Sequence, residues 1–119
     1  MYEYSAGLLS VVDGDTVDVT VDLGFRIHRE IRLRLAGVDT HETYGVPKAS
    51  EEYERGTVER EFVEAWFAEG TTDEFAWPVV IRTEKTGKFG RYLAVVERRT
   101  DGAILNDDLL SEFGEEIRY

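Results

Sequence analysis

Residues 8–35 read LLSVVDGDTVDVTVDLGFRIHREIRLRL, and this stretch decides the fold. An apolar run is followed by the turn dipeptide Asp13-Gly14 and then by valines that alternate with polar residues as far as Asp22. Alternation with a period of two is typical of a half-buried strand, and Asp-Gly between two such runs predicts a hairpin. Further on, isoleucines and leucines keep one parity up to Leu35 while arginines take the other, which predicts a third strand.

The remaining sequence predicts two helices and two more strands. A polar loop is expected over 39–49, strands over 77–81 and 92–96, a turn over 85–88 and a short helix over 105–113. Over 49–69 we expect an amphipathic helix whose glutamates, Glu51 to Glu64, form a solvated face without a catalytic role, and whose core face carries Val58, Phe62, Ala65 and Trp66. Five short strands with a helix inserted after the third favour a mainly β, α+β fold: a partly open OB-like Greek-key β-barrel.

Size and composition limit the protein to one domain over residues 1–119. A chain of 119 residues buries one core, and 42% hydrophobic residues are ordinary for a globular protein. Cysteine is absent, which excludes disulfides, thiolate metal sites and catalysis by cysteine. The N-terminus lacks the pattern of a secretory signal, so we expect an intracellular protein or one whose leader has been removed. No stretch approaches the apolar length of a membrane span, so we expect no membrane partner, and we expect a monomer, with an oligomer as the alternative.

The charge balance is unusual for a nucleic-acid binder. There are 25 acidic and 14 basic residues, a net charge of −11, and three of the basic residues are lysines. Such a negative field repels a polyanion unless salt screens it, and the Debye length falls to roughly 3 Å near 1 M salt. We therefore expect a halophilic source, which loss of the folded signal at low salt would support.

A first motif, Asp13-Gly14-Asp15-Thr16, places two carboxylates at the mouth of the predicted hairpin. Hard cations such as calcium prefer oxygen ligands of this kind. The same residues also make an ordinary Asp-Gly turn with a solvated Asp15, and the motif by itself does not separate these two interpretations.

A second motif covers residues 34–42, RLAGVDTHE. Arg34 ends a predicted strand, and the carboxylates of Asp39 and Glu42 follow it. A guanidinium can bind the charge that develops on a phosphodiester under attack, while a carboxylate positions or deprotonates water. The alternative is that Arg34 forms a surface ion pair with Glu42 or Asp39 that contributes little to stability.

A third motif, Lys88-Phe89-Gly90-Arg91, leads from a turn into the last predicted strand. A second arginine at this place can stabilise charge on the same phosphate or on the departing oxygen. The alternative is a basic turn whose glycine sets the strand register.

In this order and spacing, the three motifs resemble the active site of the staphylococcal nuclease family, over residues 8 to about 114. The resemblance implies an OB-fold barrel that hydrolyses single-stranded DNA or RNA with Ca²⁺ and leaves 3′-phosphate ends. It implies the following roles: Asp15, Asp39 and the Thr40 carbonyl as calcium ligands, Glu42 as general base, Arg34 and Arg91 as phosphate clamps, and Lys88 and Phe89 as substrate contacts.

The sequence departs from the family pattern at three positions. His41 stands where the family commonly has proline, so we expect a less rigid loop before Glu42. Phe89 replaces a frequent tyrosine, and Gly87 stands where the reference enzyme is acidic. The chain also ends before the family's last helix, where Tyr119 could replace an aromatic residue of the nucleotide site. An alternative function is a binding module on the same barrel that has lost turnover.

Overall fold

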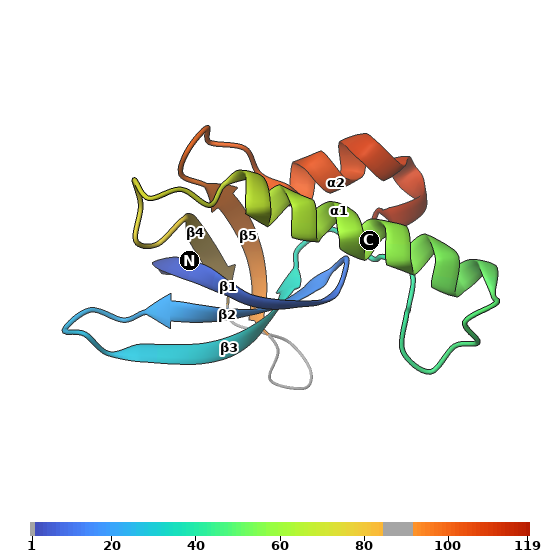
Figure 1. The fold of residues 1–119 in the computed structure, drawn as a ribbon, viewed down its shortest axis with the longest axis horizontal. Coiled ribbons are helices and arrows are strands. Elements are labelled where there is room, and N and C mark those ends of the chain that lie inside the picture. The colour runs from blue at the N-terminus through green and yellow to red at the C-terminus, as the bar shows by residue number, and fades with distance from the viewer. Residues whose placement is uncertain (1, 85–91) are drawn as a thin grey trace.

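Five strands close into a barrel in the computed structural model, which describes residues 2–84 and 92–119. The barrel order is β1-β2-β3-β5-β4, and both α-helices lie on one side of it (Figure 1). The elements are β1 (Tyr2–Asp13), β2 (Thr16–Asp22), β3 (His28–Leu35), α1 (Glu51–Glu69), β4 (Val79–Glu84), β5 (Tyr92–Arg98), α2 (Leu105–Phe113) and the 3₁₀ helix η2 (Gly114–Ile117). The predicted OB-like α+β fold is confirmed, with the barrel closed rather than partly open.

The strand register follows from the alternation in the sequence. In the β2–β3 pair, Val17 lies opposite Leu33 and Val19 opposite Ile31. Val17, Val19 and Leu33 are completely buried, because residues of one parity point into the barrel. The parallel pairing of β3 with β5, in which Leu33 lies beside Tyr92, and the pairing of β1 with β4 close the ring.

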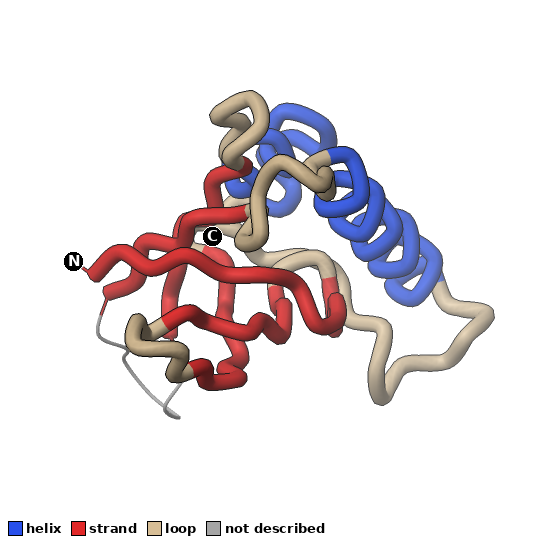
Figure 2. The backbone as a smooth tube through the Cα atoms, turned by 60° about the vertical axis from the view of Figure 1, so that its left-hand side comes forward, coloured by secondary structure: helices blue, strands red, loops and turns tan. Residues whose placement is uncertain are grey.

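The two helices cover one side of the barrel, as the second view shows (Figure 2). Trp66 and Phe67 of α1 are each 4% exposed and belong to the same core cluster as Leu105 and Leu109 of α2. The Trp66 indole N–H donates to Asp108 of α2 at 2.8 Å, which satisfies the polar edge of a buried ring. The expectation that Trp66 serves the core is therefore confirmed.

Helix α1 buries a face that overlaps only in part with the one predicted: Trp66 is buried and Phe62 packs against the core, but Ala65 is exposed. Its helical region begins at Glu51, after Ser50, whose hydroxyl accepts from Tyr53 N at 3.2 Å as an N-cap. Val58, expected on the core face, is 54% exposed. The buried stripe instead consists of Gly56, Glu59, Val63, Trp66 and Phe67. Because this stripe contains a glycine and a glutamate, the spacing of apolar residues in the sequence does not predict it.

Two further differences concern the strands. β1 begins at Tyr2, well before the predicted apolar run, and its first residues pair with β4. Ile27 was expected to share the core parity of β3 but lies outside the strand and is 56% exposed. Among the described residues, no helix combines the length and apolar character needed to span a membrane.

Candidate active site

The sheet register brings Arg34 beside the β1–β2 turn. Thr16, the first residue of β2, pairs with Arg34 near the end of β3, and Leu35 N donates to Asp15 O at 2.8 Å. The chain then passes through Gly37, which has a φ of 76°, and returns past the same turn as the loop that carries Asp39 to Thr43. Two segments of the predicted site thus meet at one end of the barrel.

Arg34 joins the two aspartates that the sequence analysis proposed as metal ligands. Its Nη2 lies 3.1 Å from Asp39 Oδ1 and 3.4 Å from Asp15 Oδ2. The guanidinium carbon also lies 5.6 Å from the centre of the Tyr119 ring, a cation–π contact. Tyr119 is 84% exposed and is attached to this end of the barrel by a hydrogen bond from its N–H to Gly37 O, 3.1 Å. An arginine, two carboxylates and an accessible aromatic ring therefore lie together.

Asp15 is a buried carboxylate with both oxygens occupied. Oδ1 accepts from the Thr16 hydroxyl at 2.9 Å, and Oδ2 accepts from Thr40 N at 3.1 Å. Burial raises the pKa of the carboxyl group, although the bonds from Thr16 and Thr40 and the charge of Arg34 act in the opposite direction. The interpretation of Asp15 as a solvated turn residue is wrong, because its side chain is 9% exposed.

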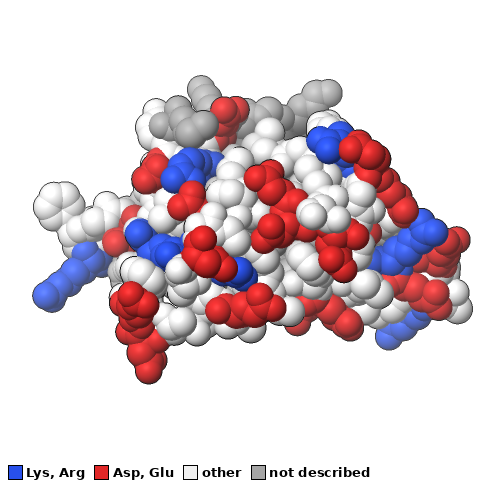
Figure 3. All heavy atoms as spheres, turned by 90° about the horizontal axis from the view of Figure 1, so that it is seen from above, with Lys and Arg blue, Asp and Glu red and all other residues white. Residues whose placement is uncertain are grey.

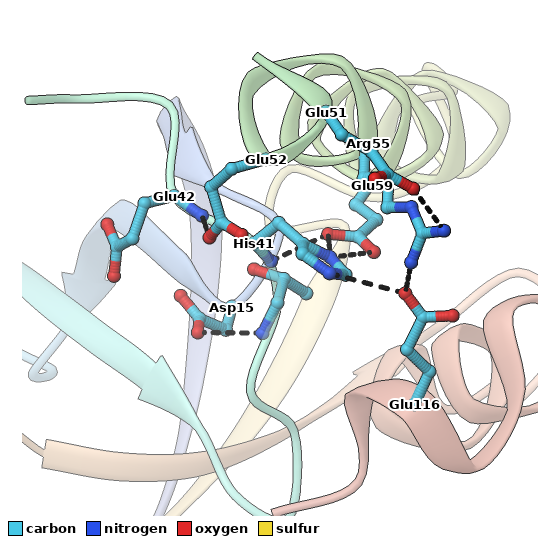
Figure 4. A network of polar contacts seen from close by, with 9 residues as sticks. Asp15, His41, Glu42, Glu51, Glu52, Arg55, Glu59 and Glu116 are labelled. Carbon is cyan, nitrogen blue, oxygen red and sulfur yellow. Dashed lines mark hydrogen bonds and ion pairs between the residues drawn. The ribbon is translucent and has the colours of Figure 1, made fainter. Parts of the chain in front are cut away.

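Four carboxylates hold the four residues that follow Asp39. Asp15 accepts from Thr40 N, and Glu59 accepts from His41 N at 2.7 Å. Glu52 accepts from Glu42 N at 2.7 Å, and Asp13 accepts from the Thr43 hydroxyl at 2.6 Å. Figure 4 shows the loop held between the β1–β2 turn on one side and helix α1 on the other. This segment, Thr40 to Thr43, is called the anchored loop below.

His41 fastens the anchored loop to two helices. Its Nδ1 lies 2.9 Å from Glu59 Oε2, and its Nε2 lies 3.2 Å from Glu116 Oε1 in η2. Glu116 in turn pairs with Arg55 of α1 (Figure 4). The prediction that histidine in place of proline makes this loop less rigid stays a prediction, and the structure adds side-chain contacts from His41 to α1 and η2.

Glu52 and Glu59 are residues that sequence reasoning missed. Both were assigned to a solvated helix face, yet Glu59 is 3% exposed and each accepts a backbone N–H of the anchored loop. The available signal was Gly56, because a glycine inside a helix is unfavourable unless another backbone approaches it. A Cβ at Gly56 would lie 2.7 Å from His41 O and 2.9 Å from Glu42 O.

Glu42 projects away from the helix that anchors its backbone (Figure 4). Its side chain reaches solvent, yet its pKa is raised, first by partial burial and then by the carboxylates of Asp13, Asp15, Glu52 and Asp39. The carboxylate thus lies in a strongly negative environment. Such a group is a stronger proton acceptor than an isolated glutamate and gains from a neighbouring cation.

The donor set fits a hard cation in chemistry. Asp15, Asp39 and Glu42 offer oxygen ligands, and the Thr40 hydroxyl is a buried oxygen without a hydrogen-bond partner. The side chains do not, however, converge on one point. Within residues 2–84 and 92–119, no three acidic or histidine side chains form a group able to hold a metal ion. In this arrangement the Arg34 guanidinium bridges Asp15 and Asp39.

The third motif lies outside the described residues, so Lys88, Phe89 and Arg91 are placed by sequence alone. Tyr92, the first residue described after them, pairs with Leu33, the neighbour of Arg34.

Among the predicted site residues that the structure describes, five lie together at one end of the barrel: Asp15, Arg34, Asp39, Thr40 and Glu42.

No family model matches the chain. No curated protein sequence matches it significantly either. The resemblance of its motifs to the staphylococcal nuclease family therefore stays a prediction.

Proposed function

We propose that this protein is a calcium-dependent nuclease that hydrolyses phosphodiester bonds of single-stranded DNA or RNA by attack of water. The observation that carries the proposal is that Arg34 Nη2 lies 3.1 Å from Asp39 Oδ1 and 3.4 Å from Asp15 Oδ2. Glu42, whose N–H donates to Glu52, lies in the electrostatic field of both aspartates. Phosphodiester hydrolysis needs a cationic group for the phosphate, a base for the water and ligands for a cation, and these residues supply them.

A calcium ion would be held by Asp15, Asp39 and the Thr40 carbonyl. The surrounding charge favours a cation, because the carboxylates of Asp13, Asp15, Asp39 and Glu52 all act on Glu42. When bound, the ion supplies polarisation of the phosphate and a template for the attacking water. Carboxylate and carbonyl oxygens indicate a hard cation in general, so other divalent ions of this class are also candidates.

Arg34 is the proposed phosphate clamp. Its side chain is 24% exposed, and its Nη2 carries the contacts to Asp15 and Asp39. A guanidinium has five N–H donors, so the group has capacity for a phosphate oxygen as well as for its carboxylate partners. Arg91 would stabilise the same phosphate in the transition state, and Lys88 and Phe89 would contact the bound strand.

Glu42 is the proposed general base. Its main-chain N–H donates to Glu52 Oε1 at 2.7 Å, and this hydrogen bond holds the main chain while the side chain extends toward solvent. An anchored main chain limits the positions that the carboxylate can sample, and holding a catalytic group in the productive geometry lowers the barrier to reaction. The raised pKa matches a group that takes a proton from water.

Cleavage of a fluorescent single-stranded DNA oligonucleotide tests the proposal. The assay is run at low and at molar salt, because the net charge of −11 repels a polyanion when it is not screened. We expect cutting that needs calcium, stops with a chelator and leaves 3′-phosphate ends. Glu42→Gln and Arg91→Ala should each lower the rate by roughly 10²- to 10⁴-fold.

Glu61→Gln is the matched control for Glu42→Gln. Glu61 is an exposed glutamate of α1 that makes no ion pair with any described residue, so its neutralisation changes net charge without touching the site. Full activity in Glu42→Gln would refute the assignment of the base. A folded protein that cuts nothing at any salt concentration would refute the enzyme.

The second candidate is a nucleic-acid or protein binding module without turnover. The Arg34–Asp39 ion pair favours it, because it is the contact expected if these charges only stabilise a surface. The two candidates differ in one result. In the presence of calcium, a binding module binds the oligonucleotide and leaves it uncut, whereas the nuclease cuts it.

A further inference from the structure

The end of the β2–β3 hairpin is an exposed apolar and basic surface far from the carboxylates of the site. Residues 23–29, called the hairpin end below, project from the barrel (Figure 1). Phe25 is 98% exposed, Ile27 56% and Leu23 44%. Exposed apolar side chains that gather at one place, unlike those scattered singly, are typical of surfaces that contact another molecule.

The backbone at the hairpin end holds Phe25 outward. Phe25 and Arg26 have positive φ values of 53° and 62°, a region that bulky residues rarely occupy. Hydrogen bonds between Leu23 N and Ile27 O and between Ile27 N and Gly24 O, both 2.9 Å, keep the loop in this form. A strained and fully exposed aromatic residue in a well-bonded loop indicates a role in binding rather than in folding.

The arginines of the hairpin end are available to an external anion. Within the described part of the chain Arg26 and Arg29 make no ion pair, whereas seven other arginines do: Arg32, Arg34, Arg55, Arg60, Arg82, Arg98 and Arg118. Residues 23–29 contain no carboxylate; the flanking acidic residues are Asp22, whose Oδ1 accepts from Gly24 N at 2.9 Å, and Glu30. By contrast, acidic side chains are spread over the face with α1 and α2 (Figure 3). The hairpin end thus presents two arginines that are not neutralised by an ion pair with any described carboxylate.

We propose that the hairpin end is a second contact surface for single-stranded nucleic acid, which holds the strand several nucleotides away from the scissile phosphate. Phe25 stacks on a base, and Arg26 and Arg29 bind phosphates. Exposed aromatic rings beside unpaired arginines match the alternation of bases and phosphates along a single strand. This inference rests on the proposed function, since it assigns the substrate a path from the site to the hairpin.

Strand β3 sets the distance between the two surfaces. From His28 to Arg34 the strand advances by six residues, which corresponds to about 20 Å at the usual rise of a strand. A stacked single strand covers this distance with about six nucleotides at about 3.4 Å each, and a more extended strand needs fewer. This length lies within the range of about 4–16 nucleotides that OB folds bind. Very short oligonucleotides should therefore not reach Phe25.

Fluorescence anisotropy with oligothymidylates of 4 and 16 nucleotides tests the proposal. Glu42→Gln protein with calcium is the background, so that the probes stay intact. Adding Phe25→Ala should weaken binding of the 16-mer about five- to a hundredfold, the value of one base–aromatic stack, and leave the 4-mer unchanged. Val58→Ala, which removes another exposed apolar side chain on α1, is the matched control. Equal affinities of both proteins for the 16-mer would overturn the proposal.

The salt dependence tests the arginines separately. For single strands the slope of log K against log salt is about 0.7 for each phosphate contact, so replacing Arg26 and Arg29 by glutamine should reduce it by about 1.4 for the 16-mer. An unchanged slope would mean that the arginines bind no phosphate. Because Arg26 and Arg29 are exposed and make no described ion pair, the double variant should fold normally.

Failure of this inference and failure of the nuclease proposal give different results. Calcium-dependent cutting of the 16-mer with the same KM in wild type and Phe25→Ala would leave the nuclease and remove the second surface. Length-dependent binding without any cutting would leave the surface and remove the nuclease. Sedimentation with phosphatidylserine–phosphatidylcholine vesicles that Phe25→Ala abolishes, with oligonucleotide binding unchanged, would overturn the proposal in favour of a membrane contact.

Discussion

Glu59 of α1 holds His41 by two different atoms. It accepts from the His41 main-chain N–H at 2.7 Å and lies 2.9 Å from the imidazole Nδ1. Glu59 lies 18 residues further along the chain and is 3% exposed, so this contact joins the middle of the helix to the anchored loop inside the protein. The position of Glu42, the next residue, depends on it.

Glu59→Ala should lower the free energy of unfolding by about 2–4 kcal/mol. The substitution leaves the part-buried N–H of His41 without its acceptor and removes the partner of the imidazole, and both losses destabilise the folded state. Urea unfolding followed by circular dichroism measures the change. Glu64→Ala is the matched control, because Glu64 is an exposed glutamate of the same helix whose pair with Arg60 is on the surface. An equally small effect of both substitutions would contradict the role of Glu59.

Calcium should stabilise the folded protein even if no substrate is present. A ligand that binds only the native state at a hundred times its dissociation constant adds about 2.7 kcal/mol, which raises the melting temperature of a domain of this size by roughly 10 °C. Asp39→Asn should abolish the shift, because it removes a proposed ligand that is on the surface and whose loss leaves the core intact.

Asp73→Asn is the control for the calcium experiment. Asp73 is an exposed aspartate in the segment between α1 and β4, outside the proposed site. Differential scanning fluorimetry with calcium and with a chelator compares the three proteins. The same calcium shift in Asp39→Asn as in wild type would show that the ion binds elsewhere.

The Arg98–Asp101 pair should make stability depend on pH in the acid range. Hydrogen bonding by the Arg98 side chain is the main cause that lowers the pKa of Asp101 from 3.8 to about 2. Because the folded pKa is the lower one, this stabilisation is complete above pH 4 and is lost as the pH falls from about 4 to 2. The stability difference between wild type and Asp101→Asn should therefore shrink over this interval. A difference that persists at pH 2 would contradict the pairing.

The barrel could be predicted from sequence because its signals are local. Alternation within β2 and β3 and the Asp13-Gly14 turn determine the hairpins, and α2 was predicted with its observed bounds. In the same way, Arg34 and Asp39 lie five residues apart, so one strand end and one loop are enough to bring them together.

The support of the loop could not be predicted, because it depends on contacts between distant segments. Glu59 looks like its solvated neighbours on α1, and nothing in its local sequence indicates a partner 18 residues away. Val58 was chosen for the core because it is apolar, but close approach of the anchored loop requires Gly56 and an acceptor on that face instead. Tertiary packing, rather than helix periodicity, determines which face is buried here.

Gly56→Ala tests this packing, because here we expect the substitution to destabilise the protein although it usually stabilises a helix. Alanine in place of glycine normally stabilises a helix interior by about 1 kcal/mol. Here the new Cβ would lie 2.7 Å from His41 O and 2.9 Å from Glu42 O, so the main chain of the anchored loop has to move. We expect a net loss of about 1–3 kcal/mol in urea unfolding, as for other overpacked sites, and a lower kcat because Glu42 is displaced.

Glu61→Ala is the control for Gly56→Ala, because it adds alanine to the exposed face of the same helix. It should change stability by a few tenths of a kcal/mol at most, since glutamate is already a good helix former. If Gly56→Ala instead stabilised the protein by about 1 kcal/mol, its Cβ would meet no obstacle, and the anchored loop would not lie against α1 in solution. The glycine would then be an ordinary weak point of the helix, and the placement of Glu42 by α1 would have to be abandoned.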